Sequence, residues 1–262
     1  MSYLERMRPA PGQRVLVTAG ASGIGAATAR AFLEAGARVA ICDVDKAALD
    51  AFAAEHPEVI TIVADVSDTA AVAAMIATVA ESFGALDVLV NNAGIAGPTG
   101  RVEDLDLGDI RRTLDVDILG QFIVLQGAIP LLRKGTDALI LNVASVAGRL
   151  GYPLRTPYAA AKWGIVGLTA SLAKEIGPDG IRVNAILPGP VRGPRMDRVM
   201  QDRATAEGRS FDEVQDEYLR IISLRRMVGP EDIASMALFL ASPAASGIAG
   251  QALSVCGNVE TL

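Results

Sequence analysis

The stretch TAGASGIG, residues 18–25, decides the fold of this 262-residue chain. It follows a short β-branched run, residues 14–17, and leads into a segment with helical spacing, residues 24–35. Glycines allow a sharp turn, and the start of a helix offers free N–H groups and a partial positive charge. This order predicts a cradle for a dinucleotide pyrophosphate, although an ordinary strand-to-helix turn looks similar. The residues expected at the cofactor are Thr18, Gly20, Ser22, Gly23, Ile24 and Gly25.

Asp43 comes directly after the second β-branched run and 18 residues after Gly25. A carboxylate there can accept hydrogen bonds from the adenosine ribose and would repel a 2′-phosphate. The alternative is a plain turn residue, since Asp43-Val44-Asp45 also has good turn chemistry. Ser22 is not basic, and Lys46 is the one nearby cation that complicates the choice. We therefore expect NAD as the cofactor.

The whole chain alternates short apolar runs with longer alanine-rich segments. The expected strands are residues 14–17, 38–42, 59–64, 88–90, 139–143, 182–187 and 253–255, and the expected helices are residues 24–35, 46–54, 69–83, 107–132, 159–176 and 231–240. This repetition predicts an α/β fold, a Rossmann-type doubly wound parallel sheet of about seven strands with helices on both faces. We expect a single domain over residues 1–262, with an N-terminal extension at 1–13 and a substrate flap at 188–228, helical near 212–222.

Composition narrows the function classes. Hydrophobic residues make up 51% of the chain and charged residues 21%, which is typical of a globular protein. The net charge of −6 argues against binding nucleic acid. Two cysteines fit a reducing compartment, and neither a signal peptide nor an apolar run of about 18–20 residues is evident, so we expect a cytoplasmic protein with no membrane partner. His56 is the single histidine, and no metal site is expected.

A possible catalytic group lies further along. Tyr158 and Lys162 are four residues apart, which places them on one face of a helix. A phenol, with a reference pKa of about 10, is a poor acid or base near neutrality, but a nearby ammonium favours the phenolate and makes proton transfer useful. Ser145 follows the run 139–143, at the edge of a parallel sheet where ligands bind. Its hydroxyl could bind a substrate oxygen.

Taken together, these motifs resemble the short-chain dehydrogenase/reductase family over nearly the whole chain. The matching pieces are residues 18–25, Asp65-Val66, Asn91-Asn92-Ala93-Gly94, Ser145, Tyr158 with Lys162, and residues 184–189. The resemblance implies an oxidoreductase that moves a hydride between a nicotinamide and a secondary alcohol or ketone. It also implies a homotetramer, or a homodimer.

The resemblance also implies a role for each matching residue. Tyr158 would be the general acid/base, Ser145 would polarise the carbonyl, and Lys162 would bind the nicotinamide ribose. The remaining expected cofactor contacts are Asp65 and Val66 at adenine, Asn92, Ala93 and Gly94 along the channel, and Pro188, Gly189 and Val191 beside the nicotinamide.

Two positions depart from the family pattern near the site. Ala19 stands where the family has glycine, which is tolerable if its φ is negative. Asp117 stands where the family has its fourth catalytic residue, an asparagine, and it lacks the NH₂ donor. A carboxylate there could stabilise the ammonium of Lys162 or stay protonated, and we expect a lowered or pH-shifted activity.

Loops at residues 95–101, 146–157 and 190–227 are expected to set the substrate, whose class could be a polyol, sugar, hydroxy acid or cyclic alcohol. Arg155, Arg192 and Arg195 could bind an anionic substrate; the plainer alternative is that flap arginines face solvent or pair with neighbouring acids.

Competing functions remain open. One is an NADPH-dependent 3-oxoacyl thioester reductase, which Asp43 and the non-basic Ser22 disfavour. Another is a non-catalytic NAD-binding regulator, which the intact Ser145, Tyr158 and Lys162 disfavour.

Overall fold

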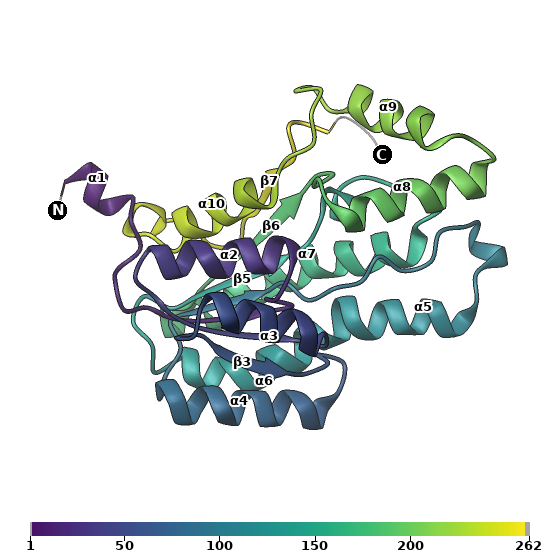
Figure 1. Cartoon of the computed structure of the whole chain (residues 1–262). Coiled ribbons are helices and arrows are strands. Elements are labelled where there is room, and N and C mark those ends of the chain that lie inside the picture. Colours follow the sequence, from purple (N-terminus) through teal and green to yellow (C-terminus); the bar gives the residue numbers. More distant parts are fainter. Residues whose placement is uncertain (1, 260–262) are drawn as a thin grey trace.

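A computed structural model describes residues 2–259. Its seven strands form one parallel sheet in the order β3-β2-β1-β4-β5-β6-β7. The strands are β1 Arg14–Thr18, β2 Arg38–Asp43, β3 Ile60–Val63, β4 Val88–Asn91, β5 Leu139–Val143, β6 Arg182–Pro188 and β7 Ala252–Val255. The α-helices are α1 Tyr3–Arg6, α2 Gly23–Glu34, α3 Lys46–Glu55, α4 Thr69–Phe83, α5 Leu107–Leu114, α6 Gly120–Leu132, α7 Thr156–Ile176, α8 Pro194–Glu207, α9 Phe211–Ile221 and α10 Pro230–Leu240. Helices lie around this sheet, and α8 and α9 lie together near the C-terminal end (Figure 1). The predicted doubly wound sheet is confirmed.

Successive residues of each strand point to opposite faces of the sheet, and helices cover both faces. Leu16 of β1 packs with buried residues of α4, α6 and α7. Its neighbours Val15 and Val17 pack on the other face, with buried residues of α2, α3 and α10. Two apolar clusters, one on each side, therefore explain why the strands read as unbroken apolar runs.

The strand order reverses beside β1, which pairs with β2 on one side and β4 on the other. The loops that leave β1 and β4 are tied together at this point. The Thr18 hydroxyl accepts hydrogen bonds from the backbone N–H groups of Asn92 and Ala93, both at 2.9 Å. The Asn92 side chain donates back to the Thr18 carbonyl at 3.0 Å. Such a reversal, at the carboxyl ends of parallel strands, is where ligands bind in folds of this kind.

The structure corrects several predicted boundaries. The expected helix over residues 107–132 is α5 and α6 joined by a π-helical segment, Asp115–Leu119. The strand expected over 59–64 is shorter, and the extension at 1–13 contains α1. The flap region holds two helices, and α8 was not expected, because it begins in a stretch rich in Arg, Gly and Pro. It buries little apolar side-chain surface, chiefly Val199 and Met200.

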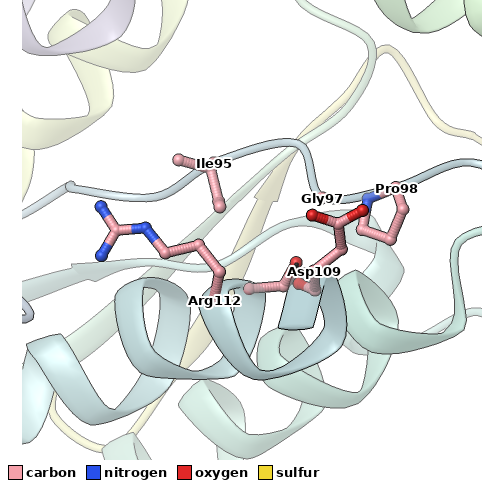
Figure 2. Close-up of a pocket in the computed structure, with 6 residues that line it drawn as sticks. Ile95, Gly97, Pro98, Asp109 and Arg112 are labelled. Carbon is pink, nitrogen blue, oxygen red and sulfur yellow. Dashed lines mark hydrogen bonds between the residues drawn. The ribbon is translucent and has the colours of Figure 1, made fainter. Parts of the chain in front are cut away.

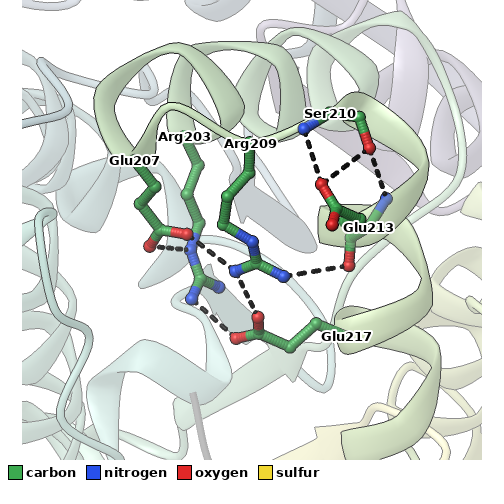
Figure 3. Close-up of polar contacts among 6 residues, drawn as sticks. All are labelled: Arg203, Glu207, Arg209, Ser210, Glu213 and Glu217. Carbon is green, nitrogen blue, oxygen red and sulfur yellow. Dashed lines mark hydrogen bonds and ion pairs between the residues drawn. The ribbon is translucent and has the colours of Figure 1, made fainter.

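Ion pairs join α8 to α9 (Figure 3). Arg203 and Arg209 each reach both Glu207 and Glu217, at 2.6–2.8 Å. Tyr218 of α9 is buried among apolar residues of the two helices. The flap is therefore a packed helical pair fastened by charge, not an irregular loop.

The helix that runs from Leu107 to Leu132 is long and apolar enough to span a membrane by length and composition. This corrects the expectation that no apolar segment reaches that length. Core helices pass the same test, and Val124, Leu125 and Ala128 of this one lie in the core against the sheet. The helix is therefore weak evidence for a membrane, and the expected lack of a membrane partner stays a prediction.

Candidate active site

The glycine-rich turn between β1 and α2 has the shape of a cradle. Gly23 adopts a φ of 52°, in the left-handed region that favours glycine. A Cβ on Gly25 would lie 2.0 Å from the Ala19 carbonyl oxygen, so no larger residue fits. The Ser22 hydroxyl makes no capping hydrogen bond to α2. The first N–H groups of α2 therefore remain available to a ligand.

Ala19 contradicts the expectation of a negative φ. Its φ is 49°, in the left-handed region, where an L-residue with a Cβ pays about 1–2 kcal/mol. The Asn92 side chain donates to the Ala19 carbonyl at 3.2 Å and helps to hold this conformation. Backbone strain thus lies in the turn that is expected to hold the pyrophosphate.

Asp43, at the end of β2, lies beside this turn. Its carboxylate accepts hydrogen bonds from the backbone N–H groups of Ala21 and Asp45, both at 3.2 Å. Two bonds leave further lone pairs on the carboxylate oxygens. Lys46, the nearby cation, pairs with Asp50 at 2.7 Å. Asp43 can therefore stabilise the turn and still accept hydrogen bonds from a ribose.

Asp65, expected at adenine, has a cationic partner that the sequence reasoning missed. Arg112 of α5 binds the Asp65 carboxylate at 2.7 Å and the Ser67 hydroxyl at 2.6 Å. Burial raises the pKa of Asp65, but hydrogen bonds from Ser67 and Arg112 lower it more, so the net pKa is below its usual value. Val66 is buried, and a Cβ on Gly120 would lie 2.8 Å from it. The contact was not predicted because Arg112 and Asp65 are 47 residues apart in the sequence.

The structure brings Tyr158 and Lys162 together on α7. The Lys162 ammonium lies 5.4 Å from the centre of the Tyr158 ring. It donates to the Val143 carbonyl at the end of β5, at 3.3 Å, and only 3% of Lys162 is exposed. A charged group so deeply buried is held where its field acts on the phenol.

Ser145 lies two residues beyond Val143, so it follows directly on the strand end whose carbonyl holds Lys162. Its hydroxyl oxygen accepts a hydrogen bond from the Ala147 N–H at 3.1 Å, and its own proton remains to be donated. The following turn packs closely on α7, because a Cβ on Gly148 would lie 2.7 Å from the Lys162 carbonyl oxygen. This packing brings the segment that begins at Ser145 against the helix of the Tyr158–Lys162 pair.

Asp117 lies fully buried in the π-helical segment, a feature frequent at functional sites. One carboxylate oxygen accepts a hydrogen bond from the Ile95 N–H at 2.6 Å. The other lies 3.5 Å from the Lys162 ammonium and has no hydrogen-bond partner. A Cβ on Gly94 would lie 3.1 Å from that ammonium, so the loop after β4 closes onto the pair. The chain thus has a buried ion pair at this position.

The residues expected beside the nicotinamide lie where β6 ends. Pro188 is the last residue of β6, and the Gly189 N–H donates to the Val255 carbonyl at 3.0 Å. A Cβ on Gly189 would lie 2.7 Å from that of Cys256, so this position accepts only glycine. Val191 pairs with Val228 in an isolated bridge that closes the base of the flap.

The three candidate substrate arginines differ in their contacts. Arg192 forms an exposed ion pair with Glu231. Arg195, near the start of α8, donates to the Gly94 carbonyl at 2.8 Å and so links the flap to the loop after β4. Arg155 is buried directly before α7.

A shallow pocket lies between the segment after β4 and α5 (Figure 2). Its lining residues are Ile95, Gly97, Pro98, Asp109, Arg112 and Thr113. None of the expected catalytic residues lines it. One lining residue, Ile95, donates its backbone N–H to Asp117 and so links the pocket to the expected catalytic residues.

Comparison with known proteins shows the family to which this chain belongs. Residues 18–258 match a family model described as enoyl-(acyl carrier protein) reductase. The cis-4-hydroxycyclohexanecarboxylate dehydrogenase of Sinomonas cyclohexanicum is 38% identical, over 93% of this chain and 94% of that protein. The levodione reductase of Leifsonia aquatica is 34% identical, over 93% and 92%. The 3-oxoacyl-[acyl-carrier-protein] reductase of Thermotoga maritima is 35% identical, over 95% and 98%. This chain belongs to the short-chain dehydrogenase/reductase family.

Solved structures of family members have the same fold over nearly the whole chain. An NAD⁺-bound xylitol dehydrogenase has a TM-score of 0.91 at 29% identity, covering 95% of this chain and 99% of its own. An actinorhodin polyketide ketoreductase with NADPH has a TM-score of 0.89 at 33% identity, covering 94% and 96%. The chain is therefore an oxidoreductase that uses a nicotinamide cofactor and acts on a secondary alcohol or ketone. A purely non-catalytic role is not supported.

Proposed function

We propose that this dehydrogenase uses NAD in preference to NADP and that Tyr158 is its proton-transfer group. Asp43 carries the coenzyme preference: its carboxylate lies at the cradle, and the one nearby lysine is paired with Asp50. A 2′-phosphate would meet a carboxylate without a neighbouring free cation. The relatives that bind NAD⁺ and NADPH share the fold, so this local charge distinguishes the two coenzymes.

The residues present fit a dinucleotide. Gly25 cannot carry a Cβ, and the start of α2 has unused N–H groups for a pyrophosphate. Thr18, Gly20, Ser22, Gly23 and Ile24 complete that turn. Asp65 and Val66 would flank the adenine, and Asn92, Ala93 and Gly94 would line the channel. Pro188, Gly189 and Val191 would lie at the nicotinamide, and Lys162 at its ribose.

A bound nicotinamide supplies the hydride acceptor or donor at its C4 carbon. The chain's own residues handle the proton. In alcohol oxidation the Tyr158 hydroxyl oxygen takes the substrate's hydroxyl proton, and in reduction it returns that proton. Lys162 favours the phenolate by its charge, and Ser145 donates its free hydroxyl proton to the substrate oxygen. Asp117 acts through Lys162 and is a positioning residue.

Assembly as a homotetramer, or a homodimer, is also proposed. Three large apolar side chains are exposed: Leu119 at the end of the π segment, Phe122 on α6 and Trp163 on α7, at 49%, 44% and 51%. Apolar side chains gathered on neighbouring helices are typical of an interface. Light scattering of the purified protein measures the state directly. A cytoplasmic location and the lack of nucleic-acid partners remain part of the proposal, supported by the net charge of −6 and the two free cysteines.

The test is turnover of polyols, sugars, hydroxy acids and cyclic alcohols with NAD and NADP in parallel, followed through reduced cofactor at 340 nm. We expect NAD to be preferred by at least about tenfold in kcat/KM, about 1.4 kcal/mol. Asp43→Ser should narrow that preference, and Tyr158→Phe should abolish turnover while cofactor binding persists. Turnover with NADP alone, on 3-oxoacyl thioesters, would replace the proposal with the reductase alternative.

A further inference from the structure

Arg155 is a buried cation at the reacting end of the site. It lies three residues before Tyr158 and is 4% exposed. Its guanidinium carbon lies 5.0 Å from the centre of the Tyr158 ring and 5.3 Å from that of Tyr152. The two rings hold the guanidinium beside the phenol that transfers the proton.

The guanidinium has hydrogen-bond donors that no group of residues 2–259 accepts from. Nη2 donates to the Ala96 carbonyl, whereas Nε and Nη1 are buried without a partner. Over residues 2–259, no carboxylate lies within ion-pair distance of Arg155. Burying a charge with unfilled donors costs free energy, and an anion that reaches them would recover it.

Of the other cations considered for the site, two have an acidic partner and the third is exposed to solvent. Lys162 has Asp117 at 3.5 Å, and Arg192 has Glu231. Arg195 binds a carbonyl and is exposed. Arg155 therefore leaves one uncompensated positive charge in a site of low exposure, where a charge attracts an anion most strongly.

We propose that Arg155 binds a carboxylate of the substrate, so that the preferred substrate is a hydroxy acid or its keto acid. This rests on the proposed function and names the substrate class for the same site. The guanidinium is permanently charged and can form two parallel bonds to a carboxylate. One relative is named for 4-hydroxycyclohexanecarboxylate, and the levodione reductase is not named for an acid, so the names alone leave the class open.

Access to Arg155 is coupled to the flap. Tyr152, which lies against the guanidinium, shares a hydrogen bond of 2.5 Å with Tyr218 of α9. Because Nε and Nη1 are shielded from solvent, a neighbouring side chain must move before an anion reaches them, and Tyr152 is a neighbour that contacts the flap. Tyr152 therefore contacts both the residue proposed to bind the carboxylate and the flap.

Two measurements on the full-length protein test the proposal. The first compares cis- and trans-4-hydroxycyclohexanecarboxylate and 3-hydroxybutyrate with their neutral amides. Arg155→Gln should raise KM for the acids at least tenfold and change KM for the amides less than threefold, with Arg155→Lys in between. Arg133→Gln, an exposed arginine paired with Asp179, is the matched control and should change neither.

The second measurement needs no turnover. Calorimetry of the NAD-loaded protein with cyclohexanecarboxylate should show binding that weakens at least tenfold in Arg155→Gln, and cyclohexanecarboxamide should bind poorly to both. Absence of carboxylate binding to the wild type, or equal loss for acids and amides, overturns the proposal. If the carboxylate proposal fails but the enzyme oxidises neutral alcohols with NAD, the proposed function still holds. Turnover of no alcohol, with carboxylate binding intact, would overturn the function and not the anion site.

Discussion

At the scale of the residue, Asp117 is the departure with the largest chemical consequence. The family has an asparagine at this position, and here a buried carboxylate faces the Lys162 ammonium at 3.5 Å. An Asp117→Asn variant keeps an oxygen to accept from the Ile95 N–H, so its fold should survive. The substitution changes the charge at the site while leaving its shape nearly the same.

We expect Asp117→Asn to raise alcohol oxidation near neutral pH by up to about tenfold. The reason is that the substitution removes a buried carboxylate 3.5 Å from the Lys162 ammonium, so the field of the ammonium acts on the Tyr158 hydroxyl with less opposition. Full profiles of kcat and kcat/KM for both proteins measure this. Superimposable profiles would show that the charge at position 117 has no influence on proton transfer.

Ala19 gives a prediction about stability. Its φ of 49° favours glycine, which the family pattern carries at this place. Ala19→Gly should raise the free energy of unfolding by up to about 1 kcal/mol, because relief of strain exceeds the added freedom of the unfolded chain. Thermal unfolding measures it. Ala21→Gly, a control in the same turn without a positive φ, should lower stability, and a loss in both variants would contradict the argument.

At the scale of the element, the flap depends on the ion pairs between α8 and α9. Burial raises the pKa of Glu217, but hydrogen bonds from Arg209 and Arg203 lower it by more, so the pKa of Glu217 lies below its usual value. A lowered carboxylate pKa stabilises the folded state above the unfolded value, and that contribution is lost as the pH falls through the folded one. The fastening between the helices should therefore weaken in acid.

Glu217→Gln should loosen α8 and α9 at pH 7, by about 1 kcal/mol or less because the pair is partly exposed. Hydrogen exchange over residues 194–221 should speed up, and the difference from the wild type should shrink below about pH 4. Asp216→Asn, on the same helix and exposed, is the matched control. Equal exchange in all three proteins would show that apolar packing alone holds the flap.

The elements that sequence patterns predicted well are those with strong periodicity. The strands and the helices that cover them carry long apolar runs, because both faces of the sheet are buried. α8 escaped prediction because it has no side-chain cap at its start and is held by ion pairs and by a few buried side chains such as Val199 and Met200. The π segment around Asp117 escaped because one extra residue in a turn leaves the apolar pattern almost unchanged.

The residues of the site also differ in whether the sequence predicts their positions. The predicted positions of Tyr158, Lys162 and Ser145 match the structure, because helical spacing and the end of a parallel strand fix them. Their catalytic roles stay a prediction. The Arg112–Asp65 and Arg195–Gly94 contacts join distant parts of the chain through long, flexible side chains. Their direction is set by tertiary packing, which no local pattern encodes.

At the scale of the whole molecule, Asp87 joins three parts of the fold. It binds the Arg14 guanidinium at 2.7 Å and the N–H groups of Arg14 and Thr136 at 2.8 and 2.7 Å, at the start of β1 and the loop before β5. Burial raises its pKa, but these hydrogen bonds lower it more, so its net pKa lies below the usual value. Its stabilisation is present above the unfolded pKa of about 3.9 and is lost as the pH falls through the folded value.

Asp87→Asn should lower the free energy of unfolding at pH 7 by about 2–4 kcal/mol, because the carboxylate is nearly buried and its partners stay behind. Urea unfolding at pH 7 and near pH 3 tests this, since the gap between variant and wild type should close in acid. Asp179→Asn, at the exposed pair with Arg133, should change little at either pH. A gap that persists at pH 3 would point to packing instead of charge.

The placement of β1 in the middle of the sheet affects how the chain is made. Leu16 pairs with Ala40 on one side and with Leu89 on the other. A ribosome adds about 5–20 residues each second, so a nascent chain waits several seconds between the two partners. Throughout that interval the N–H and C=O groups along one edge of β1 lack their strand partner, and a newly made chain is then most exposed to capture by a chaperone or by another nascent copy.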